Sequence, residues 1–303
     1  MELPPIPPSD ALADLLPGDV DLDDAGRLRH EAARPVWYGM VWSRLGRGDL
    51  AWAHWDRVHL PELQPWIGAE RGRVLRELGL HARAEALEWP ALLDAVDPVD
   101  AAMLRVSLAA DAVGLGDLDR ARRRLAAATE AVAALPDSPR AARQRLRLAW
   151  VDVEVAALEG RPLPTDRLPY FDEASGEPQQ PHDALHGTRF HHAKGLLFGG
   201  VVRGDRRLLD AAAAIAPPVI AWAVHLARAD LPATSRDAEP ADEEAAARAA
   251  WAALVLPPGV DGEVASTPVA RRLHPAVPGG ADATGGAPGT GSADSARQTG
   301  RSG

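Results

Sequence analysis

The stretch from Ala102 to Leu135 constrains the fold more than any other part of the sequence. It reads AMLRVSLAADAVGLGDLDRARRRLAAATEAVAAL, with small and apolar residues at helical spacing on both sides of a break at 114–117. Spacings of three and four residues place such side chains on one face of a helix. The Gly-Leu-Gly-Asp break is typical of a tight turn. The stretch therefore predicts two antiparallel helices joined by a short connection.

These residues resemble a tetratricopeptide (TPR) repeat. The positions that match its large, small and bulky sites, and its turn, are Leu108, Ala109 and Ala112 on the first helix, Gly116-Asp117 between the helices, and Ala121, Leu125 and Ala128 on the second. The resemblance implies stacked helical hairpins with a concave groove that receives a peptide or a partner domain. Because a fold does not fix a function, the groove alone names no partner.

Neighbouring segments repeat the pattern less regularly. Turn glycines are expected at Gly48, Gly79, Gly116, Gly160 and Gly204, at spacings of 31, 37, 44 and 44 residues. A strict TPR array repeats every 34 residues. The predicted fold is all-α, an α-solenoid of antiparallel helical hairpins that is TPR-like. Any helical hairpin needs small residues at its crossings and a turn glycine, so a solenoid outside the TPR class stays an alternative.

Composition divides the chain into five segments. They are a Pro/Asp-rich N-terminal segment at 1–21, TPR-like repeats at 22–160, a Pro-rich loop at 161–181, a C-terminal helical hairpin with a capping helix at 182–256, and a tail at 257–303. The tail is rich in Gly, Pro, Ser, Ala and Thr. Such a composition buries too little apolar surface to offset its ordering entropy, and it predicts disorder. The loop is either a functional element or a tolerated insertion.

Charge and residue usage exclude several classes of protein. The net charge of −10 argues against nucleic-acid binding by bulk charge. Cysteine is absent, so disulfides and thiolate metal sites are excluded. No signal-peptide pattern opens the sequence, and the low-charge run at 211–227 is too short and Pro-broken for a typical membrane span. We therefore expect a cytoplasmic protein that binds neither nucleic acid nor a membrane.

Four histidines form the one cluster that suggests metal chemistry: His182, His186, His191 and His192. His182 and His186 are one helical turn apart, so both side chains could face the same metal ion. Asp183 stands where a zincin has glutamate, and no third ligand is evident. A metal-dependent enzyme or metal-binding domain in this half is thus the alternative to an adaptor, and a hydrated helix face is the simpler explanation.

Other motifs indicate structure rather than catalysis. Arg-Gly-Asp occurs at 47–49 and at 203–205, in both cases where a helical hairpin is expected to turn. No phosphate-binding loop, dinucleotide fingerprint or nucleophile elbow is present. The sequence therefore predicts a non-enzymatic protein without a cofactor.

The candidate binding residues follow from the TPR resemblance and from charge. The resemblance implies that Met103, Val106, Ala110 and Val113 line the concave side of the central repeat. Arg140, Arg143 and Arg147 share the face opposite the apolar stripe of the next helix. They either form a solvated face or pair with acidic groups of a bound peptide.

We therefore expect a protein–protein interaction scaffold whose groove receives an apolar segment with acidic flanks, from a partner protein or from this chain's own lead-in or loop. Closure of the groove by neighbouring helices is the competing expectation. The sequence leaves the partner and the oligomeric state open.

Overall fold

The computed structural model describes residues 34–164, 168, 170–171, 178–179, 189–231 and 239–273. Within these residues the chain is helical, apart from a short antiparallel pairing of β1 (Tyr170–Phe171) with β2 (Pro178–Gln179). The expected all-α class is confirmed for this part of the chain. The segment at 1–21, most of the Pro-rich loop, and His182 and His186 lie outside the described residues.

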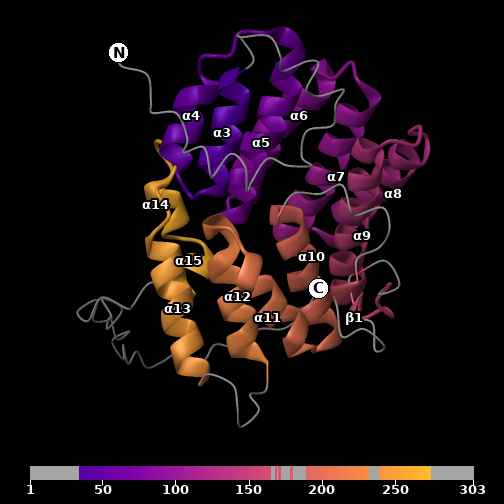
Figure 1. Ribbon diagram of the computed structural model, residues 1–303. Helices are drawn as coiled ribbons and strands as arrows, with labels where there is room; N and C mark the ends of the chain where they lie inside the picture. The colour runs from indigo at the N-terminus through magenta and orange to yellow at the C-terminus, as the bar shows by residue number, and fades with distance from the viewer. Residues whose placement is uncertain are drawn as a thin grey trace, which may run out of the picture.

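The first half consists of helical hairpins (Figure 1). Its helices are α3 (Arg34–Arg44), α4 (Gly48–Trp55), the short 3-10 helix η2 (Pro61–Leu63), α5 (Gln64–Glu77), α6 (His81–Asp94), α7 (Pro98–Gly114), α8 (Leu118–Ala133) and α9 (Pro139–Glu159). Contacts are densest within the pairs α3–α4, α5–α6 and α7–α8, and α9 packs against both α7 and α8.

Local sequence signals set the limits of the α7–α8 hairpin. The carboxylate of Asp97 accepts a hydrogen bond of 2.7 Å from the backbone N–H of Val99 and caps α7. Asp117 caps α8 in the same way, at 3.0 Å from the N–H of Arg120. Between the helices Gly116 has φ +71°, a conformation that glycine adopts without a steric penalty. The hairpin predicted at 102–135 is therefore present, extended at its start to residue 98.

The turn between α3 and α4 differs from the expectation. We expected Gly48 to supply the left-handed residue, but Gly46 does so, with φ +77°. Gly48 is the first residue of α4, where an added Cβ would lie 2.7 Å from Cδ of Pro257. The glycine in the first Arg-Gly-Asp is thus required by close packing. Gly204 in the second has φ +63° and turns the chain as expected.

The second half contains further hairpins and two short terminal helices. They are α10 (Arg189–Arg203), α11 (Arg206–Ile215), α12 (Pro218–Asp230), α13 (Pro240–Ala252), α14 (Asp261–Val264) and α15 (Pro268–Leu273). The break expected at Pro217-Pro218 separates α11 from α12. We expected the tail to start at residue 257. This boundary is wrong, because the two short helices α14 and α15 follow it, and the second of them ends at Leu273.

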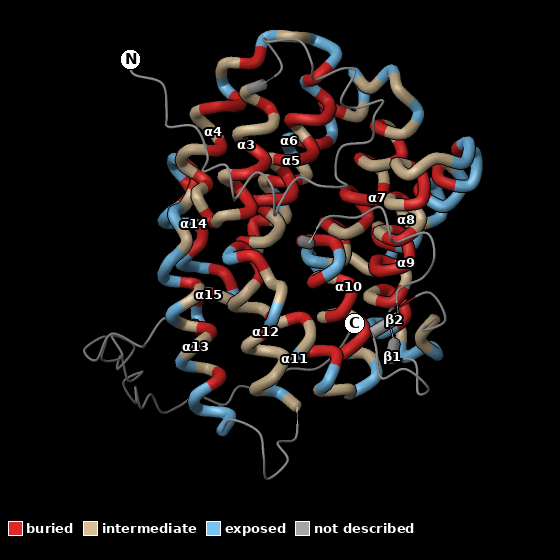
Figure 2. The backbone as a smooth tube through the Cα atoms, viewed as in Figure 1, coloured by how far each residue is buried: buried red, intermediate tan, exposed pale blue. Residues whose placement is uncertain are grey.

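The last helices return to the first hairpins. Ala247, Trp251, Val264 and Leu273 belong to the same buried cluster as Val36, Trp55 and Ile67. Figure 2 shows α14 and α15 close to the first hairpins, and α13, α14 and α15 each contain buried residues, drawn in red. Helix α13 thus packs against the first hairpins as well as against α12. Ala247 and Trp251 of α13 are buried in this cluster, whereas Ala245 and Ala249 on its other face are exposed.

Backbone hydrogen bonds fix this closure at the α3–α4 turn. The N–H of Gly48 donates to the carbonyl of Val255 at 2.7 Å, and the N–H of Val255 donates to the carbonyl of Gly46 at 2.8 Å. Val255 lies shortly after the end of α13 at Ala252, so the bonds join two segments that lie about 200 positions apart in the sequence.

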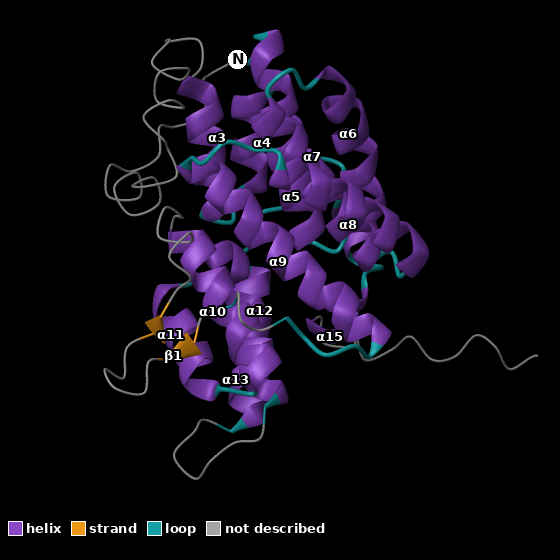
Figure 3. Cartoon of the chain, turned by 90° about the vertical axis from the view of Figure 1, so that its right-hand side faces the viewer, coloured by secondary structure: helices purple, strands orange, loops and turns teal. Residues whose placement is uncertain are grey.

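Helix α9 is buried on two sides. Leu148, Val151 and Val155 pack with α7 and α8, whereas Leu146 and Trp150 form a second cluster with Phe198 of α10. Figure 3 shows α9 crossing between the hairpins of the first half and the helices of the second. This long helix therefore forms a wall that both halves share.

Candidate functional site

Most of the expected groove residues line one cavity. Met103, Val106, Ala110 and Val113 of α7 border a space of about 420 Å³ together with Arg143 and Arg147 of α9. Volumes of this order are typical of sites for small ligands or for a few side chains of a peptide. We call this space the interhelical cavity.

Arg140 does not line the interhelical cavity. Its guanidinium donates to Asp97 at 3.0 Å and to Asp100 at 2.6 Å, on α7 and at its start. Arg140 therefore joins α9 to α7. The pairing expected between this arginine and the acidic group of a ligand is replaced by pairing within the chain.

The opposite walls come from helices that the sequence did not connect with the groove. They contribute Trp66, Arg73, Arg76 and Glu77 from α5, Phe190, His191, Lys194 and Phe198 from α10, and Ile220 and Trp222 from α12. Helices α10 and α12 thus line the same cavity as α7.

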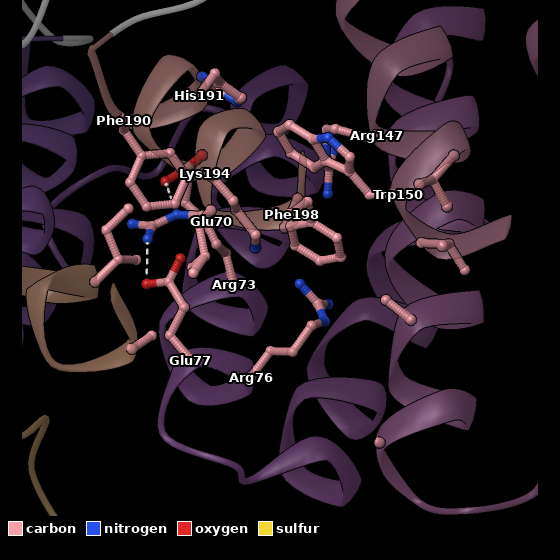
Figure 4. Close-up of a pocket in the computed structure, with 18 of the residues that line it drawn as sticks. Glu70, Arg73, Arg76, Glu77, Arg147, Trp150, Phe190, His191, Lys194 and Phe198 are labelled. Atoms are coloured by element: carbon pink, nitrogen blue, oxygen red, sulfur yellow. Dashed lines mark hydrogen bonds and ion pairs between the residues drawn. The ribbon is translucent and has the colours of Figure 1, made fainter. Parts of the chain in front are cut away.

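Phe190 holds α10 against the first half. Its side chain is buried, and its ring lies under the guanidinium of Arg44 at 4.1 Å and near that of Arg73 at 5.3 Å, measured to the ring centroid. Arginine groups pack favourably over aromatic faces when they are shielded from water. This contact fixes the position of Lys194, one helical turn further along α10 (Figure 4).

The arginines of α5 already have carboxylate partners. Arg73 donates to Glu70 at 2.9 Å and to Glu77 at 2.7 Å. Arg76 donates to Asp111 at 2.8 Å and to Glu88 at 2.6 Å, and so joins α5 to α7 and α6. Burial alone would lower the pKa of Arg76, but the two carboxylates outweigh it and raise that pKa.

The two carboxyl groups beside Arg76 differ in acidity. Burial raises the pKa of Glu88 to about 8, against the opposing charge of Arg76. Burial acts in the same sense on Asp111, but Arg76 and a hydrogen bond from His81 bring the pKa of Asp111 below its usual value. At neutral pH the shared charge of this pair therefore resides mainly on Asp111.

Arg147 and Lys194 lack such partners. Arg147 donates to the neutral oxygens of Gln144 at 3.0 Å and of Ser107 at 2.8 Å. Lys194 Nζ lies 5.8 Å from the ring centroids of both Trp150 and Phe190. Among the described residues, no carboxylate lies within 4 Å of either cation. Burial lowers the pKa of Arg147 to about 10 and that of Lys194 to about 8.

The lining carries a surplus of positive charge. Six of its described residues are arginine or lysine and three are glutamate. One of these glutamates, Glu154, lies on the same helix as Arg147, and burial raises its pKa. A buried cation without a counterion is unfavourable, so this lining favours an anionic occupant.

Part of the histidine cluster lies in this region. His191 stacks on Trp150, with ring centroids 6.4 Å apart, and meets Phe190 edge-on at 5.4 Å. His192 is exposed. The described part of the chain contains no group of three or more His, Cys, Asp or Glu placed to hold a metal ion. The pair His182 and His186 lies outside it, so metal binding there stays a prediction.

The structure offers no membrane-spanning element in the residues that it describes, since none of their helices is both long and apolar enough to cross a bilayer. Comparison with family models, curated proteins and solved structures finds no match.

Proposed function

We propose that this protein is a non-enzymatic adaptor built from TPR-like helical hairpins, whose interhelical cavity receives an acidic, partly apolar segment of a partner protein. The proposal unites the groove implied by the sequence with the cavity described above. The hairpins α3–α4, α5–α6 and α7–α8 provide the repeat-like half. The second half covers the groove and adds cationic and aromatic side chains to it.

One observation supports this proposal most. Apolar residues of α7 and cationic residues of α9 and α10 line the same cavity, and two of these cations have no carboxylate partner among the described residues. An acidic side chain would supply the missing charge, and apolar neighbours would contact Val106 and Val113. By contrast, no observation on the described residues favours the metal-dependent alternative.

Filling the cavity tests the proposal. Ala110 lines the cavity and is only partly buried, so Ala110→Trp should occupy the space while α7 remains helical. We expect the full-length wild-type protein to select peptides with Asp or Glu beside apolar residues from a displayed random library. The tryptophan variant should bind the selected peptides at least about tenfold more weakly, because its indole occupies their site.

Ala127→Trp is the matched control, because it makes the same change at an exposed position of α8. Circular dichroism would show whether both variants keep their helical content. The adaptor proposal is overturned if the wild type enriches no acidic peptides, or if Ala110→Trp binds them as well as Ala127→Trp does. Should the tryptophan variant unfold, Ala110→Leu offers a smaller filling of the same cavity.

A further inference from the structure

We infer that Arg147 and Lys194 form an anion subsite that holds one carboxylate of the bound segment, while Trp150 and Phe198 contact an adjoining aromatic or apolar group. This inference rests on the proposed adaptor function and names the chemistry that the interhelical cavity recognises. The carboxylate is either a chain terminus or an Asp or Glu side chain, since both present the same two oxygens.

The two cations approach the same space from different helices. Arg147 belongs to α9 and Lys194 to α10, and both line the interhelical cavity. Figure 4 shows Arg147 beside Trp150, and Lys194 on the side of Phe198 that faces Phe190. The charge of Arg147 is also among the smaller causes that lower the pKa of Lys194, after burial. The guanidinium and the ammonium group could thus bind the same carboxylate.

The charges already present leave this subsite positive. Arg76 faces the same space, but Asp111 and Glu88 bind it. Glu77, which also raises the pKa of Lys194, binds Arg73 at 2.7 Å.

Glu70 also acts on Arg147, but it pairs with Arg73 at 2.9 Å and with Arg44 at 3.7 Å. The remaining glutamate of the lining is Glu154. The charge of Lys194 lowers the pKa of Glu154, but burial outweighs this effect and raises that pKa overall. One carboxylate with a raised pKa does not offset both Arg147 and Lys194. An incoming carboxylate would therefore meet a net positive field.

The stacked rings of Trp150 and Phe198 line the same cavity as Arg147 and Lys194. The rings of Trp150 and Phe198 are stacked with their centroids 5.6 Å apart and an interplanar angle of 13°. His191 continues the stack on Trp150 at 18°. Such a surface favours planar or apolar groups. The subsite therefore suits an acid whose charge is next to an aromatic or bulky apolar side chain.

The reactivity of the Lys194 amine can be followed by itself, because the chain contains one lysine. Acetylation by an N-hydroxysuccinimide ester, followed by peptide mapping, reports the accessibility of this amine in the unmodified full-length protein. Three N-acetylated tetrapeptides serve as probes: one ends in phenylalanine with a free carboxylate, the second is its C-terminal amide, and the third is an amide with aspartate next to phenylalanine.

We expect the free acid, the aspartate peptide or both to slow acetylation of Lys194 at least about fivefold at saturation, and the uncharged amide to leave the rate unchanged. Protection by the free acid alone identifies a chain terminus, and protection by the aspartate peptide alone identifies a side chain. Equal protection by all three peptides would overturn the anion subsite. It would leave the cavity as a binding site, so the adaptor proposal would stand.

Substitutions test the same point by calorimetry. Arg147→Gln and Lys194→Met should each weaken binding of the protecting acid by about tenfold or more, because each removes a charge-assisted contact. Arg145→Gln is the matched control on α9, since Arg145 pairs at 2.9 Å with the exposed Asp137. Affinity unchanged by both test substitutions would overturn the subsite. If no peptide protects or binds, and the library selection in the previous section also fails, both proposals are overturned.

The pH dependence gives a further test of Lys194. The pKa of this amine is about 8 in the free protein, so affinity for the acid should fall as the pH rises from 7 to 9. The groups that influence this amine are Arg76 and Glu77 on α5 and Arg147 and Glu154 on α9. Lys194→Met should remove the fall, and a fall that persists in this variant would contradict the role of the lysine.

Discussion

Glu88 is a carboxyl group of α6 in the interior of the molecule. Its side chain is fully buried, next to Gly72, where an added Cβ would lie 2.1 Å from Oε1 of Glu88. Arg76 binds this oxygen at 2.6 Å and thereby connects α5 to α6. Glu88 thus forms a buried polar contact between neighbouring helices.

Glu88→Gln should make stability less dependent on pH. The folded-state pKa of Glu88, about 8, lies above the unfolded value near 4.5. Its contribution to stability is therefore fully present below about pH 4.5 and is lost as the pH rises through 8. Glutamine keeps the shape and an oxygen for Arg76 but does not ionise. Between pH 5 and 8 we expect the variant to lose less stability than the wild type, by on the order of 1–3 kcal/mol.

Urea unfolding at several pH values would measure this difference. Glu85→Gln is the control on the same helix. Arg124 lowers the pKa of Glu85, so the contribution of Glu85 is present above its unfolded pKa and is lost only in acid. If Glu88→Gln and the wild type show parallel curves from pH 5 to 8, Glu88 is not the group that titrates in this range.

At the scale of the elements, the α7–α8 hairpin shows what the sequence makes predictable. Capping aspartates, a turn glycine and the spacing of alanines are local signals, and they fixed both helices to within a few residues. The stripe of α9 was equally visible, and its members Ala142, Leu146 and Val153 are buried. Leu146 and Val153 belong to the cluster with α10, so the side of α9 that packs on α7 and α8 was not predicted. Which other helix a stripe contacts is not a local property.

Ala121 is the residue of α8 that best tests this hairpin. It is fully buried and packs in the cluster of α7, α8 and α9. Ala121→Leu adds three carbon atoms to a close helix crossing and should lower the free energy of unfolding by about 1–3 kcal/mol. Ala126→Leu, at an exposed site of the same helix, should be nearly neutral. Equal stability of the two variants in denaturant melts would show that the helix crossing at Ala121 accommodates a larger side chain without strain.

At the scale of the whole molecule, closure of the chain determines the site. The sequence named seven candidate binding residues on α7 and α9, and all of them except Arg140 line the interhelical cavity. The sequence did not predict that α5, α10 and α12 form the other walls of the cavity, because that depends on contacts between residues far apart in the chain. The composition of 257–273 wrongly predicted disorder. A few apolar side chains are enough to order a segment when they are buried between helices that have already formed.

Truncation separates the two parts of the region that the sequence assigned to a tail. A cut after Leu256 removes Val260, Val264, Ala270 and Leu273, which are buried in the cluster with the first hairpins. It also removes the bonds from Arg83 to the Gly259 carbonyl and to Glu263. Since each buried aliphatic side chain contributes on the order of 1–3 kcal/mol, we expect this cut to lower the melting temperature by about 5 °C or more.

A cut after Leu273 keeps α14 and α15 and should leave the melting temperature within a few degrees of the full chain, as the composition of 274–303 predicts. Leu273→Ala in the full chain would show whether buried contacts, rather than chain length, account for the loss. If the chain ending at 256 had the same melting temperature as the full-length protein, α14 and α15 would contribute nothing to closure. The cavity walls from α10 and α12 would then be held by the packing of α12 on α13, the Val255 bonds to the α3–α4 turn, α9 and Phe190.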